Sequence, residues 1–205
     1  MPTDLPNLLT ISRILAVPVL VLLAALQTPW GDVGACALFS LAAITDYFDG
    51  KIARERQLIS AFGRMLDPIA DKLLVGAALM LLAGLSRLSL LGLLPAIVIL
   101  LREILVSGLR EYLASLAVGL PVTRLAKWKT GVQMTALGVL LAGDTGASAL
   151  GLSFLPVSAI GEALLWLAAA LTLLTGRDYL MAGLRHAEAQ DTARNAASPK
   201  ELSRP

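Results

Sequence analysis

Six long apolar runs constrain the fold of this chain more than any other feature of its sequence. They cover residues 8–27, 34–52, 67–85, 90–113, 131–150 and 160–180. A helix needs roughly 20 residues to cross the hydrocarbon core of a bilayer, and each run is close to that length. Only 16% of the residues are charged, against about 25% in an average soluble domain. We therefore predict an all-α, polytopic membrane protein with six transmembrane helices.

The lysine and arginine residues predict how these spans are oriented. With the N-terminus inside, the outer loops are 27–33, 84–90 and 144–158, and they hold one basic residue, Arg87. The other sixteen of the seventeen basic residues lie on the inner side or in the inner half of a span. Because cytosolic loops of membrane proteins are enriched in Lys and Arg, both termini are expected in the cytosol.

The remaining sequence predicts one membrane domain over residues 1–182 and a polar cytosolic tail over 183–205. The tail has mixed charge and few apolar residues, so it is expected to be disordered. The single cysteine, Cys36, excludes an internal disulfide, and the only histidine, His186, has no partner for catalysis. A net charge of +2 gives no reason to expect a nucleic-acid partner.

Four aspartates lie where the second and third spans meet. The segment from Asp46 to Asp71 follows the skeleton D-x2-D-G-x2-A-R-x8-G-x3-D-x3-D. Asp46 and Asp49 are three residues apart, and Asp67 and Asp71 are four apart, so each pair lies on one helical face. Since the two spans are antiparallel neighbours, all four carboxylates are expected together at their cytosolic ends.

Four carboxylates at the edge of a bilayer repel one another and are costly unless a cation compensates them. Hard divalent cations do so with oxygen ligands, and Mg²⁺ prefers a few carboxylates together with phosphate oxygens. The alternative is that these side chains are helix caps and loop charges, with Asp67 capping the third span before Pro68. The set of four favours a metal site.

The skeleton resembles the signature of the CDP-alcohol phosphatidyltransferases at all eight fixed positions and at every gap. This resemblance implies two divalent ions, Mg²⁺ or Mn²⁺, bound by Asp46, Asp49, Asp67 and Asp71. It implies that Asp71 is the general base and that an alcohol oxygen attacks the phosphate carrying diacylglycerol, so that CMP leaves. The residues expected to bind CDP-diacylglycerol are Asn7, Thr10, Gly50, Ala53, Arg54, Ser60 and Gly63.

Two basic stretches bear on the acceptor alcohol. Residues 102–114 read R-E-I-L-V-S-G-L-R-E-Y-L-A, and residues 126–133 read A-K-W-K-T-G-V-Q. With the opening N-L-L-T-I-S-R at 7–13, they resemble bacterial phosphatidylglycerophosphate synthases. That resemblance implies sn-glycerol 3-phosphate as acceptor, a bacterial cytoplasmic membrane with the active site facing the cytosol, and a homodimer through the third and fourth spans. The expected acceptor-binding residues are Arg13, Arg102, Arg110, Lys127 and Lys129.

Simpler interpretations exist for these basic residues. Lys127 and Lys129 also fit the inside-positive signal and contact with lipid head groups, Arg102 also fits an intramembrane pair with Glu103, and Arg13 also fits an inner anchor. A transferase of the same family with another acceptor, such as a cardiolipin synthase or an inositol-phosphate transferase, is the main alternative. A divalent-cation carrier is disfavoured, because its acids usually lie near the bilayer midplane and inverted repeats are common.

Overall fold

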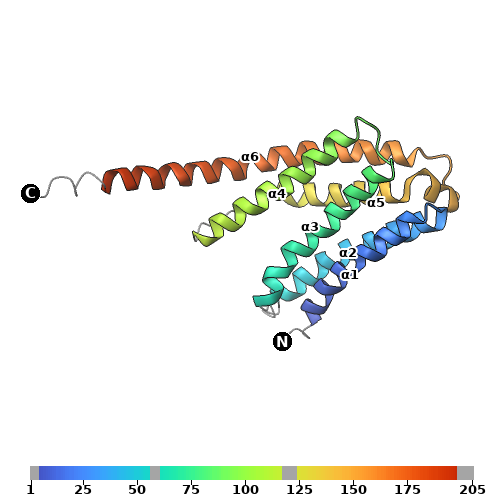
Figure 1. Ribbon diagram of the computed structural model, residues 1–205, viewed down its shortest axis with the longest axis horizontal. Helices are drawn as coiled ribbons and strands as arrows, with labels where there is room; N and C mark the ends of the chain where they lie inside the picture. The colour runs from blue at the N-terminus through green and yellow to red at the C-terminus, as the bar shows by residue number, and fades with distance from the viewer. Residues whose placement is uncertain (1–4, 56–60, 117–123, 198–205) are drawn as a thin grey trace, which may run out of the picture.

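The computed structural model describes residues 5–55, 61–116 and 124–197 (Figure 1). Within these residues the chain forms helices and no β-strand. The helices are α1 (Leu5–Ala25), α2 (Pro29–Glu55), α3 (Ala61–Gly84), α4 (Leu93–Ser115), α5 (Arg124–Ala149) and α6 (Val157–Ala197). The prediction of an all-α chain with one helix for each apolar run is therefore confirmed.

The helices pack as a bundle in which α5 has the central place. It packs against α2 on one side and α6 on the other, while α1 packs against α2 and α3, and α4 packs against α6 (Figure 1). Buried leucine, alanine and phenylalanine side chains fill the interior, among them Leu20, Phe39, Leu137 and Leu165. Although α3 and α4 are consecutive, they contact each other over only a short stretch. The two helices diverge from there, and the cavities described below lie between them.

Glycines allow α6 to approach its neighbours closely. A Cβ atom added to Gly161 would lie 2.6 Å from Cγ of Leu140 on α5, and one added to Gly183 would lie 2.8 Å from Cδ1 of Leu109 on α4. Small residues at such positions are typical of helix packing in membranes, where close backbone approach replaces the hydrophobic effect as the driving force. These contacts fix α6 against α4, which brings α6 residues next to the basic segment of α4.

A buried ion pair joins three parts of the bundle at the end away from the α2–α3 connection. Arg87, between α3 and α4, pairs with Asp32 of α2 and also donates to the Leu141 carbonyl oxygen of α5 at 2.8 Å. Thr145 donates a further hydrogen bond to Asp32, whose exposed fraction is 1%. This neutralisation explains why one basic residue is tolerated among the predicted outer loops, where the inside-positive rule disfavours it.

The C-terminal part of α5 is interrupted. Gly143 has φ +56°, a conformation in which a side chain is rarely found. Beyond this kink Asp144 accepts a hydrogen bond from the Ser158 backbone amide at 3.0 Å, which satisfies one of the free donors at the start of α6. The run predicted over 131–150 is thus a regular helix only up to the kink.

The surface supports a membrane protein. Many large apolar side chains are exposed, including Leu22, Met80, Leu101 and Leu174, in contrast to soluble monomers, which rarely expose large apolar patches. Judged only by length and composition, Val157–Arg177 is the one helix in the described ranges that can cross a bilayer by itself, and Thr10–Ala25 is apolar but shorter. The count of six spans and the cytosolic placement of both termini stay predictions.

The last helix extends farther than the sequence suggested. Its backbone is helical to Ala197, inside the segment 183–205 that we expected to be a disordered tail, and in Figure 1 this part projects beyond the bundle. Alanine, the residue with the highest helix propensity, supplies five of the fifteen residues from 183 to 197. Polar composition alone therefore did not predict where this helix ends.

Candidate active site

A cavity of about 620 Å³ opens between α2, α3 and α4. Asp46 of α2 and Asp71 of α3, two of the four aspartates singled out by the sequence, both line it. The structure therefore brings these two carboxylates to one space, as predicted from the antiparallel arrangement of the second and third spans. The other side chains that line the cavity are Pro68, Ile69, Lys72, Arg102, Glu103, Val106, Ser107, Arg110 and Glu111.

A smaller cavity of about 150 Å³ adjoins the first and extends toward α5. Both cavities share Asp71, Arg102, Glu103 and Arg110, so Asp71 lies where the two spaces meet. Val106 also lines both cavities, and the smaller one is further lined by Ala126, Lys129, Thr130, Gln133 and Met134. Its walls therefore come from the two basic stretches that the sequence analysis associated with the acceptor.

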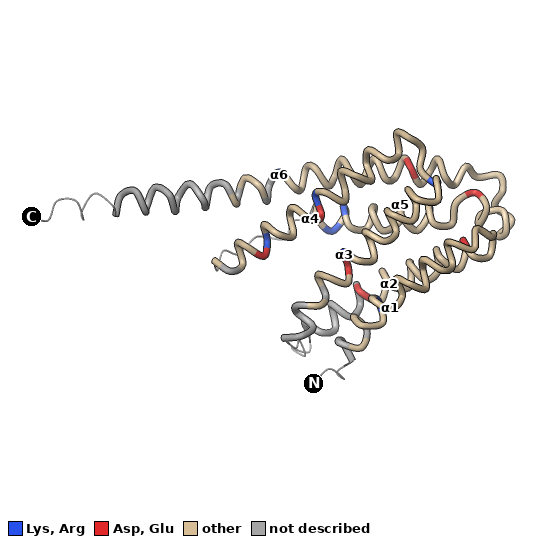
Figure 2. The backbone as a smooth tube through the Cα atoms, in the orientation of Figure 1, with Lys and Arg blue, Asp and Glu red and all other residues tan. Residues whose placement is uncertain are grey.

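The two cavities differ in the charge of their lining. Four acidic residues and three basic residues line the larger one, whereas the smaller one has three basic residues, Arg102, Arg110 and Lys129, against two acidic ones, Asp71 and Glu103. In Figure 2 charged positions accordingly gather where α3, α4 and α5 face one another. An excess of positive charge suits an anionic ligand in the smaller cavity, and an excess of carboxylates suits a cation in the larger one.

Arg13 of α1 pairs with Asp46 of α2. The arginine side chain is 4% exposed and the aspartate side chain is 41% exposed, so the guanidinium approaches the carboxylate from the protein interior. A cation therefore already contacts a predicted metal ligand, and the open side of Asp46 faces the larger cavity. The Asp46 carboxylate therefore lies where positive charge is favourable. The contact between Arg13 and the acceptor stays a prediction.

Glu103 links the basic residues of α4 and α5. Its carboxylate pairs with Lys129 of α5, and its Oε1 atom lies 3.8 Å from Nη1 of Arg102. Nη2 of Arg102 in turn donates to the Thr175 hydroxyl of α6 at 3.0 Å. The pairing of Arg102 with Glu103, one of the simpler interpretations, is therefore present, but it fixes Arg102 at the wall of both cavities.

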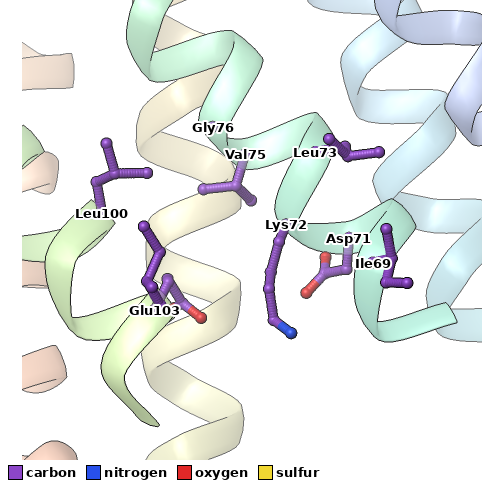
Figure 3. Close-up of a pocket in the computed structure, with 9 residues that line it drawn as sticks. Ile69, Asp71, Lys72, Leu73, Val75, Gly76, Leu100 and Glu103 are labelled. Atoms are coloured by element: carbon purple, nitrogen blue, oxygen red, sulfur yellow. The ribbon is translucent and has the colours of Figure 1, made fainter. Parts of the chain in front are cut away.

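An apolar groove of about 230 Å³ begins at the same place and follows α3 and α4 (Figure 3). Leu73, Val75 and Gly76 of α3 line it on one side, and Leu100 of α4 lies opposite. Figure 3 shows Asp71 and Glu103 at one end of the groove, with the Lys72 side chain extending toward that end. An amphiphile can thus place a polar head at the aspartate and an apolar chain between the helices.

Several predicted site residues lie outside what the structure describes. Ser60 falls in the undescribed segment 56–60, and only the helical backbone is described for Asn7, Asp49, Gly50, Ala53, Arg54, Gly63 and Asp67. The side chains that are described include no group of three or more histidine, cysteine or acidic residues able to hold a metal ion. The four-aspartate ligand set therefore stays a prediction. Of the remaining residues, Thr10 is buried at 1% exposure and Lys127 is exposed.

The sequence analysis did not predict that residues of α6 and the Gln133 side chain contribute to the site. Thr175 bonds to Arg102, and Gly176 provides the space for it, because an added Cβ would lie 3.3 Å from both Cγ and Nε of Arg102. Both residues are about seventy positions away from Arg102, and no local pattern marks such a contact. Gln133 was noticed only as part of a stretch, although its place one turn after Lys129 puts both on one face of α5.

Comparison with known proteins agrees with this geometry. The CDP-alcohol phosphatidyltransferase family matches residues 3–174. A protein of Rickettsia bellii named CDP-diacylglycerol–glycerol-3-phosphate 3-phosphatidyltransferase is 48% identical over 179 residues, which cover 87% of this chain and 94% of that protein. A protein of the same name from Cereibacter sphaeroides is 42% identical over 211 residues, covering 88% and 96%. A rice protein (Oryza sativa) named cardiolipin synthase (CMP-forming) is 44% identical over 149 residues, covering 67% and 45%.

Proposed function

This chain belongs to the CDP-alcohol phosphatidyltransferase family, and we propose that it transfers the phosphatidyl group of CDP-diacylglycerol to sn-glycerol 3-phosphate. The products are phosphatidylglycerophosphate and CMP, and the first is a precursor of anionic phospholipids. The observation that carries this choice of acceptor is the smaller cavity, where Arg102, Arg110 and Lys129 surround a space beside Asp71. The relatives matched over almost their whole length carry the name of this activity.

The excess of basic residues distinguishes a phosphorylated acceptor from a neutral one. The smaller cavity has one more basic residue than acidic residues, and an uncompensated charge inside a membrane protein is costly unless a bound anion neutralises it. The phosphate dianion of glycerol 3-phosphate meets that need, and arginine provides a forked donor geometry suited to phosphate oxygens. Arg102 and Arg110 line the space directly, while Lys127 is exposed and suits a contact with the acceptor as it enters.

Members of this family generally depend on divalent metal ions. We assign two ions, Mg²⁺ or Mn²⁺, to Asp46, Asp49, Asp67 and Asp71. In support, Asp46 and Asp71 line one cavity, its lining is acidic in balance, and Arg13 already places positive charge on Asp46. Bound ions neutralise the diphosphate and stabilise the phosphate that leaves.

Asp71 takes the role of general base in this proposal. It lines both the acidic and the basic cavity, so it lies between the two substrates. Its carboxylate removes the proton from the terminal hydroxyl of the acceptor as that oxygen forms a bond to the phosphorus carrying diacylglycerol. The bond from this phosphorus to the CMP oxygen breaks, and CMP departs with the electron pair.

The donor lipid spans the larger cavity and the apolar groove. The groove along Leu73, Val75 and Leu100 suits an acyl chain, because its walls are apolar and its polar end is at Asp71. The cytidine diphosphate is assigned to the residues that the family signature and its flanks supply, which are Asn7, Thr10, Gly50, Ala53, Arg54, Ser60 and Gly63.

The membrane arrangement follows from the same proposal. We place all six helices across the bacterial cytoplasmic membrane, with both termini and the active site on the cytosolic side, where the water-soluble acceptor is available. Exposed apolar side chains of α3 and α4, such as Met80, Ile97 and Leu101, suit contact with membrane lipids or with a second copy of the chain. A homodimer through these two helices is the arrangement we propose.

An acceptor panel tests the assignment. Purified protein in detergent receives CDP-diacylglycerol, a divalent metal ion and one acceptor, either glycerol 3-phosphate, phosphatidylglycerol or inositol phosphate, and the lipid product and CMP are quantified. We expect glycerol 3-phosphate to give phosphatidylglycerophosphate, and the other two acceptors to give no lipid product. The similarity to the rice protein named cardiolipin synthase makes cardiolipin the specific alternative. If cardiolipin forms from phosphatidylglycerol and glycerol 3-phosphate gives no product, the acceptor is phosphatidylglycerol and the proposed acceptor is wrong.

A further inference from the structure

Gln133 is a buried polar residue whose amide oxygen has no hydrogen-bond partner within the described structure. Its side chain lies on α5 with 2% of the residue exposed. The amide oxygen Oε1 is fully buried and accepts no hydrogen bond from any part of the chain that is described. Buried side-chain amides in proteins are nearly always hydrogen-bonded, because an unsatisfied polar atom is destabilising. This amide therefore suggests a ligand atom that completes it.

The place of Gln133 in the smaller cavity restricts which ligand atom that is. The cavity is lined by Gln133 together with Asp71, Arg102, Arg110 and Lys129. Two of the neighbouring cations already have partners, since Lys129 pairs with Glu103 and Nη2 of Arg102 donates to Thr175. Asp71 and a bound phosphate dianion have only acceptor oxygens, so neither provides a hydrogen for Oε1.

Among the groups of the acceptor, a hydroxyl is the one that can donate a hydrogen bond to Oε1. In sn-glycerol 3-phosphate the terminal hydroxyl gives its proton to the base during the reaction, whereas the secondary hydroxyl stays intact. We propose that the Gln133 amide binds this secondary hydroxyl and thereby selects a glycerol phosphate over phosphorylated alcohols that lack it. The inference rests on the proposed function and names the residue that recognises the glycerol part of the acceptor.

The Gln133 amide can bind the hydroxyl in either orientation of its oxygen and nitrogen atoms. With Oε1 toward the ligand, the hydroxyl donates to the amide; after a half turn of the amide, its NH₂ group donates to the hydroxyl oxygen. The spatial order also agrees, since Lys129 lies one helical turn before Gln133 on the same face of α5. A phosphate held at the lysine and arginine side chains leaves the carbon chain of the acceptor near the amide and Asp71.

The test removes the hydroxyl from the substrate and the amide from the protein. The full-length protein is assayed with CDP-diacylglycerol, a divalent metal ion and either sn-glycerol 3-phosphate or 3-hydroxypropyl phosphate, which lacks only the secondary hydroxyl. One neutral hydrogen bond corresponds to roughly 2- to 13-fold in kcat/KM, so we expect the unmodified protein to prefer glycerol 3-phosphate by about tenfold. This comparison requires no variant and so does not depend on whether a variant folds.

In Gln133→Met, an apolar side chain of similar length, kcat/KM for glycerol 3-phosphate should fall about tenfold and that for 3-hydroxypropyl phosphate should change less than about twofold. The matched control is Thr135→Val on the same helix, since the Thr135 hydroxyl is exposed and bonds to the Gly131 carbonyl oxygen. It should leave both values unchanged. The KM for CDP-diacylglycerol should be equal in all three proteins, which shows that the donor site is intact.

Three outcomes overturn the inference. Equal use of the two acceptors by the unmodified protein shows that the secondary hydroxyl is not recognised, although the proposed function stands. An equal loss with both acceptors in Gln133→Met gives the amide a structural role instead. If the unmodified protein uses neither phosphorylated acceptor but does use another alcohol, the proposed function fails and the inference fails with it.

Discussion

Replacing Arg102 by alanine tests how the acceptor phosphate is bound. Arg102 contacts both cavities, and its side chain is held by Thr175 at 3.0 Å and by Glu103 at 3.8 Å. The variant reduces the basic residues of the smaller cavity from three to two, so that they only balance Asp71 and Glu103. The fold should survive, because Glu103 keeps its pair with Lys129 and is not left as an isolated charge.

The expected effect is specific to one substrate. A charge-assisted hydrogen bond contributes about 1.5–3 kcal/mol, which corresponds to roughly 10- to 150-fold in binding. The KM for glycerol 3-phosphate should therefore rise by roughly that factor, while the KM for CDP-diacylglycerol should change little. Arg102→Lys should recover only part of the loss, because an ammonium group lacks the forked geometry of the guanidinium.

Steady-state kinetics with each substrate varied in turn measures this effect. Thr175→Val is an informative companion, since it leaves the charge in place and removes only the hydrogen bond that orients it. It should raise the KM for glycerol 3-phosphate by about fivefold, in keeping with about 1 kcal/mol for one hydrogen bond. If Arg102→Ala instead weakens CDP-diacylglycerol and spares glycerol 3-phosphate, the smaller cavity is not the acceptor site and the reasoning is refuted.

Three further variants test other parts of the account. Asp71→Asn should abolish turnover but retain CDP-diacylglycerol binding, because the amide cannot take the proton; near-normal turnover in detergent would exclude it as the base. Asp46→Ala should weaken the metal dependence and be partly rescued at higher metal concentration, whereas an unchanged metal titration would remove it from the ligand set. Arg87→Ala should lower the free energy of unfolding by about 3–5 kcal/mol by leaving Asp32 uncompensated; equal thermal stability would show that this pair contributes nothing.

The helices and part of the cavity lining were predictable because they depend on local patterns. Runs of about twenty apolar residues favour a membrane-spanning helix, and the antiparallel order of the second and third spans predicted that Asp46 and Asp71 lie close together. The structure confirms that these two carboxylates share a cavity, and that Arg102 and Arg110 line it as well. The two carboxylates were placed together by the antiparallel orientation of the second and third spans, whereas the family resemblance assigned the arginines to the acceptor.

What the sequence did not predict depends on contacts between distant helices. The pairing of Arg13 with Asp46 and of Arg102 with Thr175 is determined by how α1 and α6 pack, and neither appears in any local spacing. The kink at Gly143 was likewise invisible, since an isolated glycine in an apolar run is often compatible with an uninterrupted helix. Gln133 was overlooked because an amide draws attention only when its burial and its lack of a partner are known.

The most direct test of the central claim is the stoichiometry of one reaction. Purified protein is incubated with CDP-diacylglycerol and sn-glycerol 3-phosphate, with a divalent metal ion or with a chelator, and both CMP and phosphatidylglycerophosphate are measured. The account predicts one CMP released for each phosphatidylglycerophosphate formed, and no product in the presence of the chelator. Release of CMP without the phosphorylated lipid, or product formation that the chelator does not affect, would contradict it.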